Sequence, residues 1–483
     1  MLYGSTRVGV FNIKASQAIL QGIAPDGGLY VPQNIPDLSE IIGEDFISAA
    51  QHIFSAFFPE FALKADEIAR AAYVGQFTDP AITPLVKVGD SYVLELFHGP
   101  TAAFKDIALC ALPHLLTTAR EYTLDEREIL ILTATSGDTG SAALAGFKDV
   151  SGTRIMVFYP EDGVSPVQKA QMVTMSGENQ KVCGVNGNFD DAQTGVKKVF
   201  STFTPPKNIT LSSANSINIG RLVPQISYYF TAYTSLLKEK AITLGDKINF
   251  VVPTGNFGDI LAGYLAKQAG LPIDKLVCAT NSNDVLNDFI QTGVYDRRRK
   301  LRKTLSPSMD ILVSSNLERL LYFISKDANL VAQCMDKLQK EGYYHMSDKY
   351  MKKIRQSFLS GACNDEKALH VISRAWNKHR YLMDPHTASA WKVMEDLIQE
   401  DQLKGINVVL STASPFKFPG AIAKALNLNI PEDVSSAESL SQILNLDLPS
   451  CLKDLSHKPV LHTDVIDPAD MLNYVEKKAV EPW

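Results

Sequence analysis

Short strand-like runs alternate with helical runs along most of the chain from about residue 90 onward. Runs such as "EILILTAT", "TRIMVFYP" and "INFVVPTG" are rich in apolar and β-branched residues, and each is followed by a segment with helical periodicity. This order is typical of βαβ units, whose parallel strands are buried between layers of helices. The first eighty or so residues instead carry apolar residues at helical spacing. The sequence therefore predicts an α/β fold with parallel sheets and a mostly helical N-terminal piece.

Length, charge and cysteine content narrow the class of protein. The 483 residues exceed what one hydrophobic core supports, so two or three domains are expected. A net charge of −6 gives no reason to expect a nucleic-acid partner. Six cysteines without a CxxC pair or metal-ligand spacing predict no metal site, no disulfide framework and a reducing compartment. No signal-peptide pattern and no run near the roughly 18 apolar residues of a membrane span is found, so we expect a soluble, cytoplasmic protein without a membrane partner.

One lysine stands at the edge of what should be buried structure. The strand-like run "SYVLEL" ends near a Gly-Pro, and Lys105 then lies between Phe104 and Asp106 at the start of an apolar helical run. Burying an ammonium group costs several kcal/mol unless the group is paired or neutralised. Lys105 is therefore either a structural ion-pair partner of Asp106 or a functional amine.

Two loops rich in Gly, Ser and Thr follow predicted strands, where ligands bind in open parallel sheets. The segment "TATSGDTGSAA" could present N–H groups to an anion at a helix start, or it could simply cap that helix. The segment "VPTGNFGDILAGYLAK" matches neither the Walker motif nor the dinucleotide GxGxxG. A phosphate in this second loop would be held by backbone N–H groups and the helix dipole.

A third segment, "SANSINIGRLVPQ", places Arg221 about one turn into a helix that follows amide and hydroxyl side chains. This arrangement suits a second, separate anion, although Arg221 could also be a surface residue with a buried stem. Later in the chain, "YLMDPHTASAW" carries His386 at a helix start, where a histidine is more often a capped or core residue than a catalyst. A strand-end lysine together with two anion sites suits pyridoxal phosphate, which needs an amine for its Schiff base and a phosphate cradle.

These motifs, taken in order, resemble those of the threonine synthases, which are fold-type-II pyridoxal-phosphate enzymes. The resemblance runs nearly end to end and includes "APDGGLYVP", "FHGPTAAFKD", "TSGDTGSAA", "NSINIGRLVPQ", "PTGNFGDILAGYLAK", "DPHTA" and "STASPFKFP". It is strongest to the longer bacterial and fungal form of the family. It implies two parallel-sheet α/β domains of the tryptophan synthase β-like class with a helical N-terminal extension. It also implies a reaction in which O-phosphohomoserine and water give threonine and phosphate.

The resemblance carries roles onto matching positions. Lys105 would form the Schiff base, and the hydroxyl of Thr412 would face the pyridine nitrogen as a neutral partner. The cofactor phosphate would be held by Thr254, Gly255, Asn256, Phe257 and Gly258. The substrate carboxylate would be held by Ser136, Gly137, Asp138 and Thr139, with Asp138 also beside the cofactor's phenolic oxygen. The substrate phosphate would be gripped by Asn215, Ser216 and Arg221.

Two positions depart from the family pattern. Many members have a histidine where this chain has Ser414, so a role for that side chain is left open. Shorter relatives have Asn at the position of Asp138, and an ionised carboxylate would repel an oxygen anion on the cofactor.

The expected domains are residues 1–88, a small α/β domain at 89–210 with the lysine, and a large α/β domain at 211–483. A monomer or a homodimer is expected. One rival is a threonine-synthase-like phospho-lyase that releases 2-oxobutyrate, and a threonine or serine dehydratase is a related rival within the fold. A non-catalytic α/β binding protein is the alternative from another class, because a fold alone does not fix function.

Overall fold

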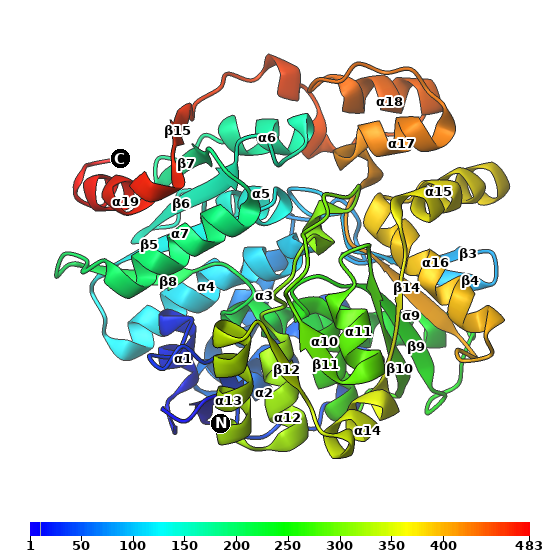
Figure 1. Cartoon of the computed structure of the whole chain (residues 1–483), viewed down its shortest axis with the longest axis horizontal. Helices are drawn as coiled ribbons and strands as arrows, with labels where there is room; N and C mark the ends of the chain where they lie inside the picture. The colour runs from blue at the N-terminus through cyan, green and yellow to red at the C-terminus, as the bar shows by residue number, and fades with distance from the viewer. Residues whose placement is uncertain (10) are drawn as a thin grey trace.

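The chain folds around two parallel sheets that lie side by side (Figure 1). We describe a computed structural model that covers residues 1–9 and 11–483. Five strands form one sheet in the order β15-β7-β6-β5-β8, and six form the other in the order β13-β10-β9-β14-β4-β3. Every pairing in the two sheets is parallel except β3 with β4. The expected fold, α/β with two parallel sheets, is confirmed.

The six-stranded sheet has helices on both faces. Its strands are β3 (Leu85–Val88), β4 (Ser91–Glu95), β9 (Ile248–Pro253), β10 (Ile273–Thr280), β13 (Phe358–Ala362) and β14 (Asn407–Ser411). Successive residues of β9 belong to different cores: Phe250 and Val252 pack toward one side, and Val251 toward the other. Because side chains alternate across a strand, both faces of β9 are buried. One face carries α9 (Ile226–Lys238) and α10 (Gly258–Gln268), and the other carries α15 (Asp365–His379) and α16 (Pro385–Gln399).

The five-stranded sheet is covered in the same way. Its strands are β5 (Glu128–Ala134), β6 (Thr153–Pro160), β7 (Gln180–Val185), β8 (Ile209–Ser213) and β15 (Asp464–Ile466). Ile131 and Val157 face the core shared with α4 (Lys105–Thr123) and α5 (Asp138–Phe147). Leu130 and Phe158 face a smaller core with α7 (Phe189–Thr202) and α19 (Met471–Val480). The alternation of apolar side chains along each strand thus explains both helical layers.

The N-terminal residues are mainly helical, as expected. Helices α1 (Ala15–Gln21), α2 (Phe46–Phe57) and α3 (Ala65–Tyr73) pack against α4 and α9, which joins this piece to the common core. Strands β1 (Tyr3–Ser5) and β2 (Tyr30–Pro32) form a small antiparallel pair. The remaining elements are α6 (Pro166–Val173), α8 (Ile219–Leu222), α11 (Val285–Thr292), α12 (Leu317–Ser325), α13 (Ala328–Lys340), α14 (Asp348–Ser357), α17 (Pro419–Leu426), α18 (Ser436–Leu444), β11 (Val294–Asp296) and β12 (Tyr343–His345).

Sheet membership does not follow the expected boundaries at residues 89 and 211. Strand β4 lies between β14 and β3 in the six-stranded sheet, although the sequence placed residues 89–210 in the small domain. Strand β8 extends past residue 211 in the five-stranded sheet, and β15 from the C-terminal segment joins the same sheet. Tertiary packing determines which strands pair. The order of strands and helices along the sequence does not indicate which sheet a given strand joins.

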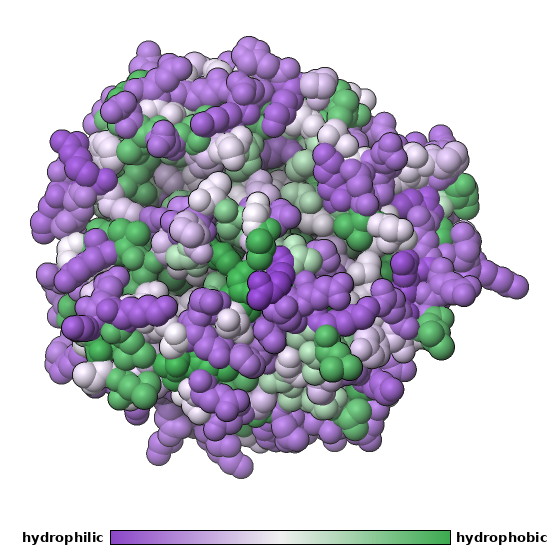
Figure 2. Space-filling model, turned by 180° about the vertical axis from the view of Figure 1, so that it is seen from behind, coloured by the Kyte–Doolittle hydropathy of each residue, from purple (hydrophilic) through white to green (hydrophobic). Residues whose placement is uncertain are grey.

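The surface is that of an ordinary globular domain. Figure 2 shows the face opposite to that of Figure 1, where hydrophilic side chains dominate and apolar ones form small separate groups. Large exposed apolar residues such as Leu63, Leu124 and Leu244 lie far apart in the sequence. Single apolar residues of this kind are normal on protein surfaces. Within residues 1–9 and 11–483, none of the helices combines the length and apolar character that a bilayer crossing requires.

Candidate active site

Lys105 begins α4 and lies beside the loop that follows β14. The backbone N–H of Phe104 donates to the Thr412 carbonyl at 2.8 Å, and the N–H of Ser414 donates to the Ala102 carbonyl at 3.0 Å. Strands β4 and β14 are neighbours in the sheet, so the loops that leave their carboxyl ends are also adjacent. This pairing places Lys105 next to Thr412 at the edge where ligands bind in such sheets.

Asp106 is not the ion-pair partner of Lys105. Its carboxylate accepts hydrogen bonds from the backbone N–H of Thr101 at 2.9 Å and from the Thr101 hydroxyl at 2.5 Å. Gly99 approaches so closely that an added Cβ would lie 2.5 Å from the Cβ of Asp106. Asp106 therefore shapes the loop before α4. The first interpretation of the lysine, a structural pair with its neighbour in sequence, is wrong.

The Lys105 amine instead faces two side chains from distant parts of the chain. Its Nζ lies 3.1 Å from the Ser308 hydroxyl and 3.4 Å from Oδ2 of Asp138. The side chain is buried, and burial lowers the pKa of Lys105 despite the opposing effect of Asp138. The positive charges of Arg221 and Lys417 lower this pKa further. An amine that loses its proton readily is suited to act as a nucleophile or base.

Asp138 opens α5 and is enclosed by polar partners. Its Oδ1 lies 2.9 Å from Nζ of Lys417 and accepts a hydrogen bond from Gln168 at 2.8 Å. Burial opposes ionisation of this carboxyl, but the charges of Lys417 and Lys105 outweigh burial and hold the pKa of Asp138 below its ordinary value. Asp138 is therefore an ionised carboxylate that lies between the amines of Lys417 and Lys105.

The loop at residues 254–258 is built as an anion cradle. It follows β9 and precedes α10, and Phe257 adopts a left-handed backbone conformation with φ of 63°. In the part of the chain that the structure describes, the backbone N–H groups of Gly255, Asn256, Phe257 and Gly258 have no hydrogen-bond acceptor. Consecutive free N–H groups at the start of a helix bind phosphate. This donor set fits the phosphate of pyridoxal phosphate.

Arg221 marks a second anion site. The residue is 4% exposed, and its guanidinium donates a hydrogen bond, at 2.5 Å, to the Ala214 carbonyl. Among the described residues, no carboxylate forms an ion pair with it. Burial lowers the pKa of Arg221 to about 10. A buried guanidinium without a protein counter-ion is costly, and an anionic ligand would satisfy it.

The two anion sites adjoin each other. A Cβ added to Gly258 would lie 3.4 Å from the Cβ of Ser216, so the cradle touches the segment before Arg221. Arg319 fixes that segment by donating to the carbonyls of Ser216 and Ile217 at 3.2 and 2.5 Å. The side-chain amide of Asn215 donates to the Ala134 carbonyl at 3.1 Å, which links this segment to the loop at residues 135–139.

Ser136 and Thr139 lie half-buried on that loop, on either side of Gly137 and Asp138. Gly137 has φ of +127°, and an added Cβ would overlap the Gln168 side chain at 2.6 Å. Glycine is therefore required at this turn. Contacts between the three predicted loops bring them together beside Lys105. A cleft of about 1490 Å³ opens onto this region and is lined by Asn215, Ser216 and Asn256.

Comparisons with known proteins agree with this geometry. Residues 79–414 match the family "Pyridoxal-phosphate dependent enzyme", residues 2–73 match "Threonine synthase N terminus", and residues 387–473 match "Threonine synthase, C-terminal". The chain belongs to the threonine synthase family. The expected resemblance and the expected cofactor class, pyridoxal phosphate, are thereby confirmed.

Alignments with individual relatives extend over most of this chain. Threonine synthase of Saccharomyces cerevisiae is 36% identical and that of Pseudomonas aeruginosa 39%, each over 88% of this chain and 90% of the relative. Human threonine synthase-like 1 is 39% identical over 88% of this chain, and the chain spans only 59% of that relative's length. A solved structure of PLP-bound threonine synthase from Brucella melitensis has a TM-score of 0.86 at 37% identity, covering 99% of this chain and 98% of that one. The yeast enzyme's structure has a TM-score of 0.87 at 34% identity, with the same coverage.

The structure also places His386 and Ser414, whose roles the sequence left open in this threonine synthase family member, and Thr412, which was expected to face the cofactor's ring nitrogen. His386 is buried, its Nδ1 lies 2.7 Å from Oδ1 of Asp384, and its Nε2 accepts from the backbone N–H of Ser308 at 3.2 Å. These partners assign the proton to Nδ1 and make His386 a support for the Ser308 loop. Ser414 accepts from the N–H of Phe416 and so caps a short turn. Thr412 is buried beside Lys105, with its backbone bonded to Phe104.

Sequence reasoning missed three residues at this site: Ser308, Gln168 and Lys417. Ser308 is 203 positions from Lys105, and Gln168 is 30 positions from Asp138. Lys417 lies in the quoted segment "STASPFKFP", where a lysine after a proline turn gave no sign of being buried. A fully buried lysine needs a counter-ion, and only the folded chain shows that this counter-ion is Asp138.

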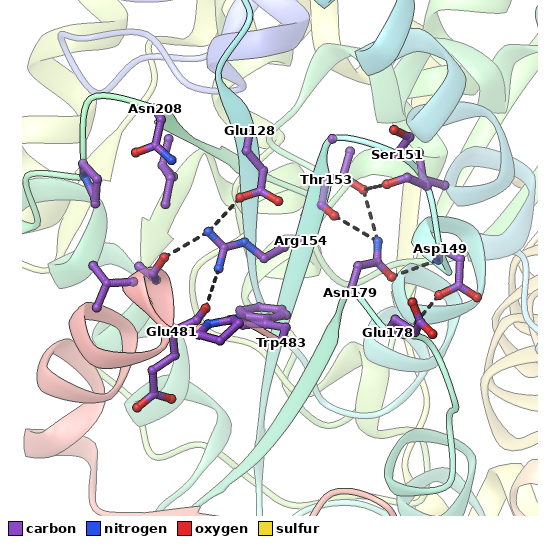
Figure 3. A pocket seen from close by; sticks show the side chains of 17 residues that line it. Glu128, Asp149, Ser151, Thr153, Arg154, Glu178, Asn179, Asn208, Glu481 and Trp483 are labelled. Atoms are coloured by element: carbon purple, nitrogen blue, oxygen red, sulfur yellow. Dashed lines mark hydrogen bonds and ion pairs between the residues drawn. The ribbon is translucent and has the colours of Figure 1, made fainter.

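A second cavity, of about 740 Å³, lies at the opposite ends of β5, β6 and β8 (Figure 3). Arg154 contacts Glu128 at 2.7 Å and donates to the carbonyls of Ala479 and Glu481, while its guanidinium lies 5.1 Å from the ring centre of Trp483. These contacts fasten the C-terminal segment to the five-stranded sheet. The Arg154 side chain is engaged in structure, and this cavity is far from the loops around Lys105.

Proposed function

We propose that this chain is a threonine synthase that converts O-phosphohomoserine and water to L-threonine and phosphate with pyridoxal phosphate. One observation carries the proposal: a buried amine, a cradle of free N–H groups and a buried guanidinium without a counter-ion among the described residues lie close together. Ser308 contacts both the Lys105 amine and Gly255, and the charge of Arg221 acts on Lys105. A cofactor phosphate and a substrate phosphate need two such anion sites, and the family's printed name agrees with this use.

The cofactor would be held by residues already in place. Lys105 would bond it covalently, the N–H groups of residues 255–258 would hold its phosphate, and Thr412 would face its ring nitrogen. When bound, pyridoxal phosphate supplies an electron sink next to the substrate's α-carbon. Thr412 is an uncharged partner, so it would not add a proton to the ring in the way that an acid would.

The substrate would be oriented at both ends. Ser136, Gly137 and Thr139 would hold its carboxylate at the start of α5, where an anion is favoured. The N–H of Gly137 already donates to the Thr135 hydroxyl, so the available backbone donors among the described residues are those of Ser136, Asp138 and Thr139. Asn215, Ser216 and Arg221 would hold its phosphate, because the guanidinium lacks an acidic partner among the described residues. Gripping both ends fixes the α-, β- and γ-carbons between them.

Lys105 would move protons once its amine is free. The Nζ lies next to the Ser308 hydroxyl and to Asp138, which together fix its direction, and its lowered pKa favours the neutral base. The amine would take one proton from the α-carbon and one from the β-carbon as phosphate leaves the γ-carbon. It would then return a proton at the γ-carbon and, after water adds at the β-carbon, a proton at the α-carbon. Asp138 is engaged with Lys417 and Gln168, so its contribution to substrate binding would come from its backbone N–H.

The test is to supply the purified chain with pyridoxal phosphate and O-phosphohomoserine. We expect a yellow protein, label on Lys105 after borohydride reduction, and threonine with phosphate as products. Lys105→Ala should lose both the colour and nearly all turnover, whereas the exposed Lys404→Ala should keep both. A chain that stays colourless, or a Lys105→Ala variant that keeps the lysine-linked colour, would contradict the proposal.

We infer further that the chain acts in the cytoplasm as a monomer or homodimer. All six cysteines are free, and five of them are buried, which suits a reducing compartment. A small phosphorylated substrate is also expected there. Fractionation of cells that express the tagged chain and light scattering of the purified protein would test the two parts separately.

A further inference from the structure

Lys417 is the last residue of a short turn at Pro415–Lys417, and its side chain is fully buried. Its Nζ lies 2.9 Å from Oδ1 of Asp138 and donates to the Thr101 carbonyl at 2.9 Å. A lysine excluded from water is stable in its charged form only with such partners. The Lys417 amine is therefore held by two partners, the carboxylate that opens α5 and the Thr101 carbonyl.

The contact joins the three segments that surround Lys105. Lys417 follows β14 of the six-stranded sheet, Asp138 opens the helix after β5 of the other sheet, and Thr101 belongs to the loop before α4. The Lys417 carbonyl also accepts from the Ser165 hydroxyl at 3.2 Å. Lys417 thus ties the two sheet units together beside the reactive amine.

The two oxygens of Asp138 are divided between two lysines. Oδ1 lies 2.9 Å from Lys417 and also binds Gln168, whereas Oδ2 lies 3.4 Å from Lys105 and accepts from Ser308 at 3.3 Å. Lys417 makes the closer ion pair. The negative charge of Asp138 is therefore mainly balanced by a lysine that has no access to the cleft.

We propose that Lys417 is a positioning residue of the active site, which holds the Asp138 carboxylate and so keeps the Lys105 amine available to pyridoxal phosphate. The inference rests on the proposed function, in which Lys105 carries the cofactor. The ion pair would also reduce the repulsion expected between an ionised Asp138 and the cofactor's phenolic oxygen, because the charges of Asp138 and Lys417 together sum to zero.

The charges around Lys105 determine the sign of the expected effects. Burial is the largest influence and lowers the pKa of Lys105; Asp138 raises it, and Arg221 and Lys417 lower it. Asp259 also faces this group, since Lys105 lowers the pKa of its carboxyl. Removing Lys417 should therefore raise the pKa of a basic nitrogen at this position, and removing the charge of Asp138 should lower it.

The experiment measures the pH midpoint of the visible absorption change of the lysine-linked cofactor in the full-length holoenzyme. We compare wild type with Lys417→Met, Asp138→Asn and the double variant. We expect the midpoint of Lys417→Met to rise by about one pH unit and that of Asp138→Asn to fall by a similar amount. The double variant should return close to wild type, because both charges of the unit are gone.

Lys417→Met leaves the buried Asp138 carboxylate without its close partner, and this could prevent folding. The comparison between the double variant and Asp138→Asn then still tests the inference. The double variant leaves no such charge, and its midpoint should then lie above that of Asp138→Asn. Equal midpoints in the double variant and Asp138→Asn, or a folded Lys417→Met with the wild-type midpoint and only a lower melting temperature, would overturn the inference. A wild type that never links the cofactor to Lys105 would instead refute the proposed function.

Discussion

The backbone carbonyl of Ser308 lies so close to residue 255 that a Cβ there would overlap the carbonyl oxygen, so Gly255 is fixed by a backbone neighbour. The same Ser308 contacts the Lys105 amine through its hydroxyl and receives support from His386. The loop around Ser308 therefore sets the distance between the phosphate cradle and the reactive lysine.

The first prediction follows from this contact. Gly255→Ala should push the cradle and the Ser308 loop apart and weaken pyridoxal phosphate at least about tenfold, which is about 1.4 kcal/mol. Gly258→Ala is the matched control, because its Cβ would meet Ser216 and Asn316 at ordinary contact distances of 3.4 and 3.5 Å. Cofactor titration by absorbance measures both. Equal affinity in the two variants would show that the cradle tolerates displacement at residue 255.

The second prediction separates the two anion sites. Arg221→Ala should leave cofactor content unchanged and weaken substrate binding by about 1.5–3 kcal/mol, the usual loss for a charge-assisted hydrogen bond. It should also weaken inhibition by inorganic phosphate. Arg120→Ala serves as the control, since that guanidinium also donates to a carbonyl, that of Gly152, which lines the second cavity at the opposite end of the five-stranded sheet. Loss of cofactor from Arg221→Ala would assign the guanidinium to the other phosphate.

The third prediction concerns pH. Burial raises the pKa of Asp259 to about 6, and its Oδ2 is buried without a hydrogen-bond partner among the described residues. A raised carboxyl pKa favours the folded state below the unfolded value near 4, and this stability is lost as the pH rises through 6. Asp259→Asn should therefore raise the free energy of unfolding at pH 7.5 by roughly 1–3 kcal/mol, and much less at pH 4.5.

Chemical denaturation of the cofactor-free chain at both pH values measures the effect. The amide oxygen of the substituted side chain could still accept from the hydroxyls of Tyr228 and Tyr229, which now donate to Oδ1 of Asp259 at 2.6 and 2.9 Å. The exposed Asp401→Asn provides a reference with no burial. If Asp259→Asn destabilises equally at pH 4.5 and 7.5, its charge is not the relevant property.

The sequence predicted those parts of the site that are local in the chain. A glycine-rich loop between a strand and a helix is visible in consecutive residues, which is why the cradle at residues 254–258 and the loop at 135–139 were found. The ion pair of Asp138 with Lys417 joins segments more than two hundred positions apart, and no local pattern announces it. The same reason explains the sheet assignment of β4 and β8, whose partners depend on packing across the whole fold.

The last prediction concerns which product is made, and it depends on Ser216. The backbone carbonyl of Ser216 accepts hydrogen bonds from Asn316 and Arg319, and Ser216 lines the cleft. Its hydroxyl has no hydrogen-bond partner among residues 1–9 and 11–483. In the proposed reaction, phosphate leaves the γ-carbon before water adds at the β-carbon. A phosphate that stays gripped can act as a base for that water, whereas a released one leaves time for hydrolysis to 2-oxobutyrate.

Ser216→Ala should therefore lower total turnover from O-phosphohomoserine and raise the fraction of 2-oxobutyrate, with threonine remaining the main product of wild type. Quantifying both products by chromatography gives the ratio, and the exposed Ser347→Ala, which also removes one hydroxyl, should leave it unchanged. Wild-type product dominated by 2-oxobutyrate would favour the phospho-lyase over the synthase. A slower Ser216→Ala variant with an unchanged product ratio would keep the synthase and exclude a role for the retained phosphate, because the grip would then affect binding alone.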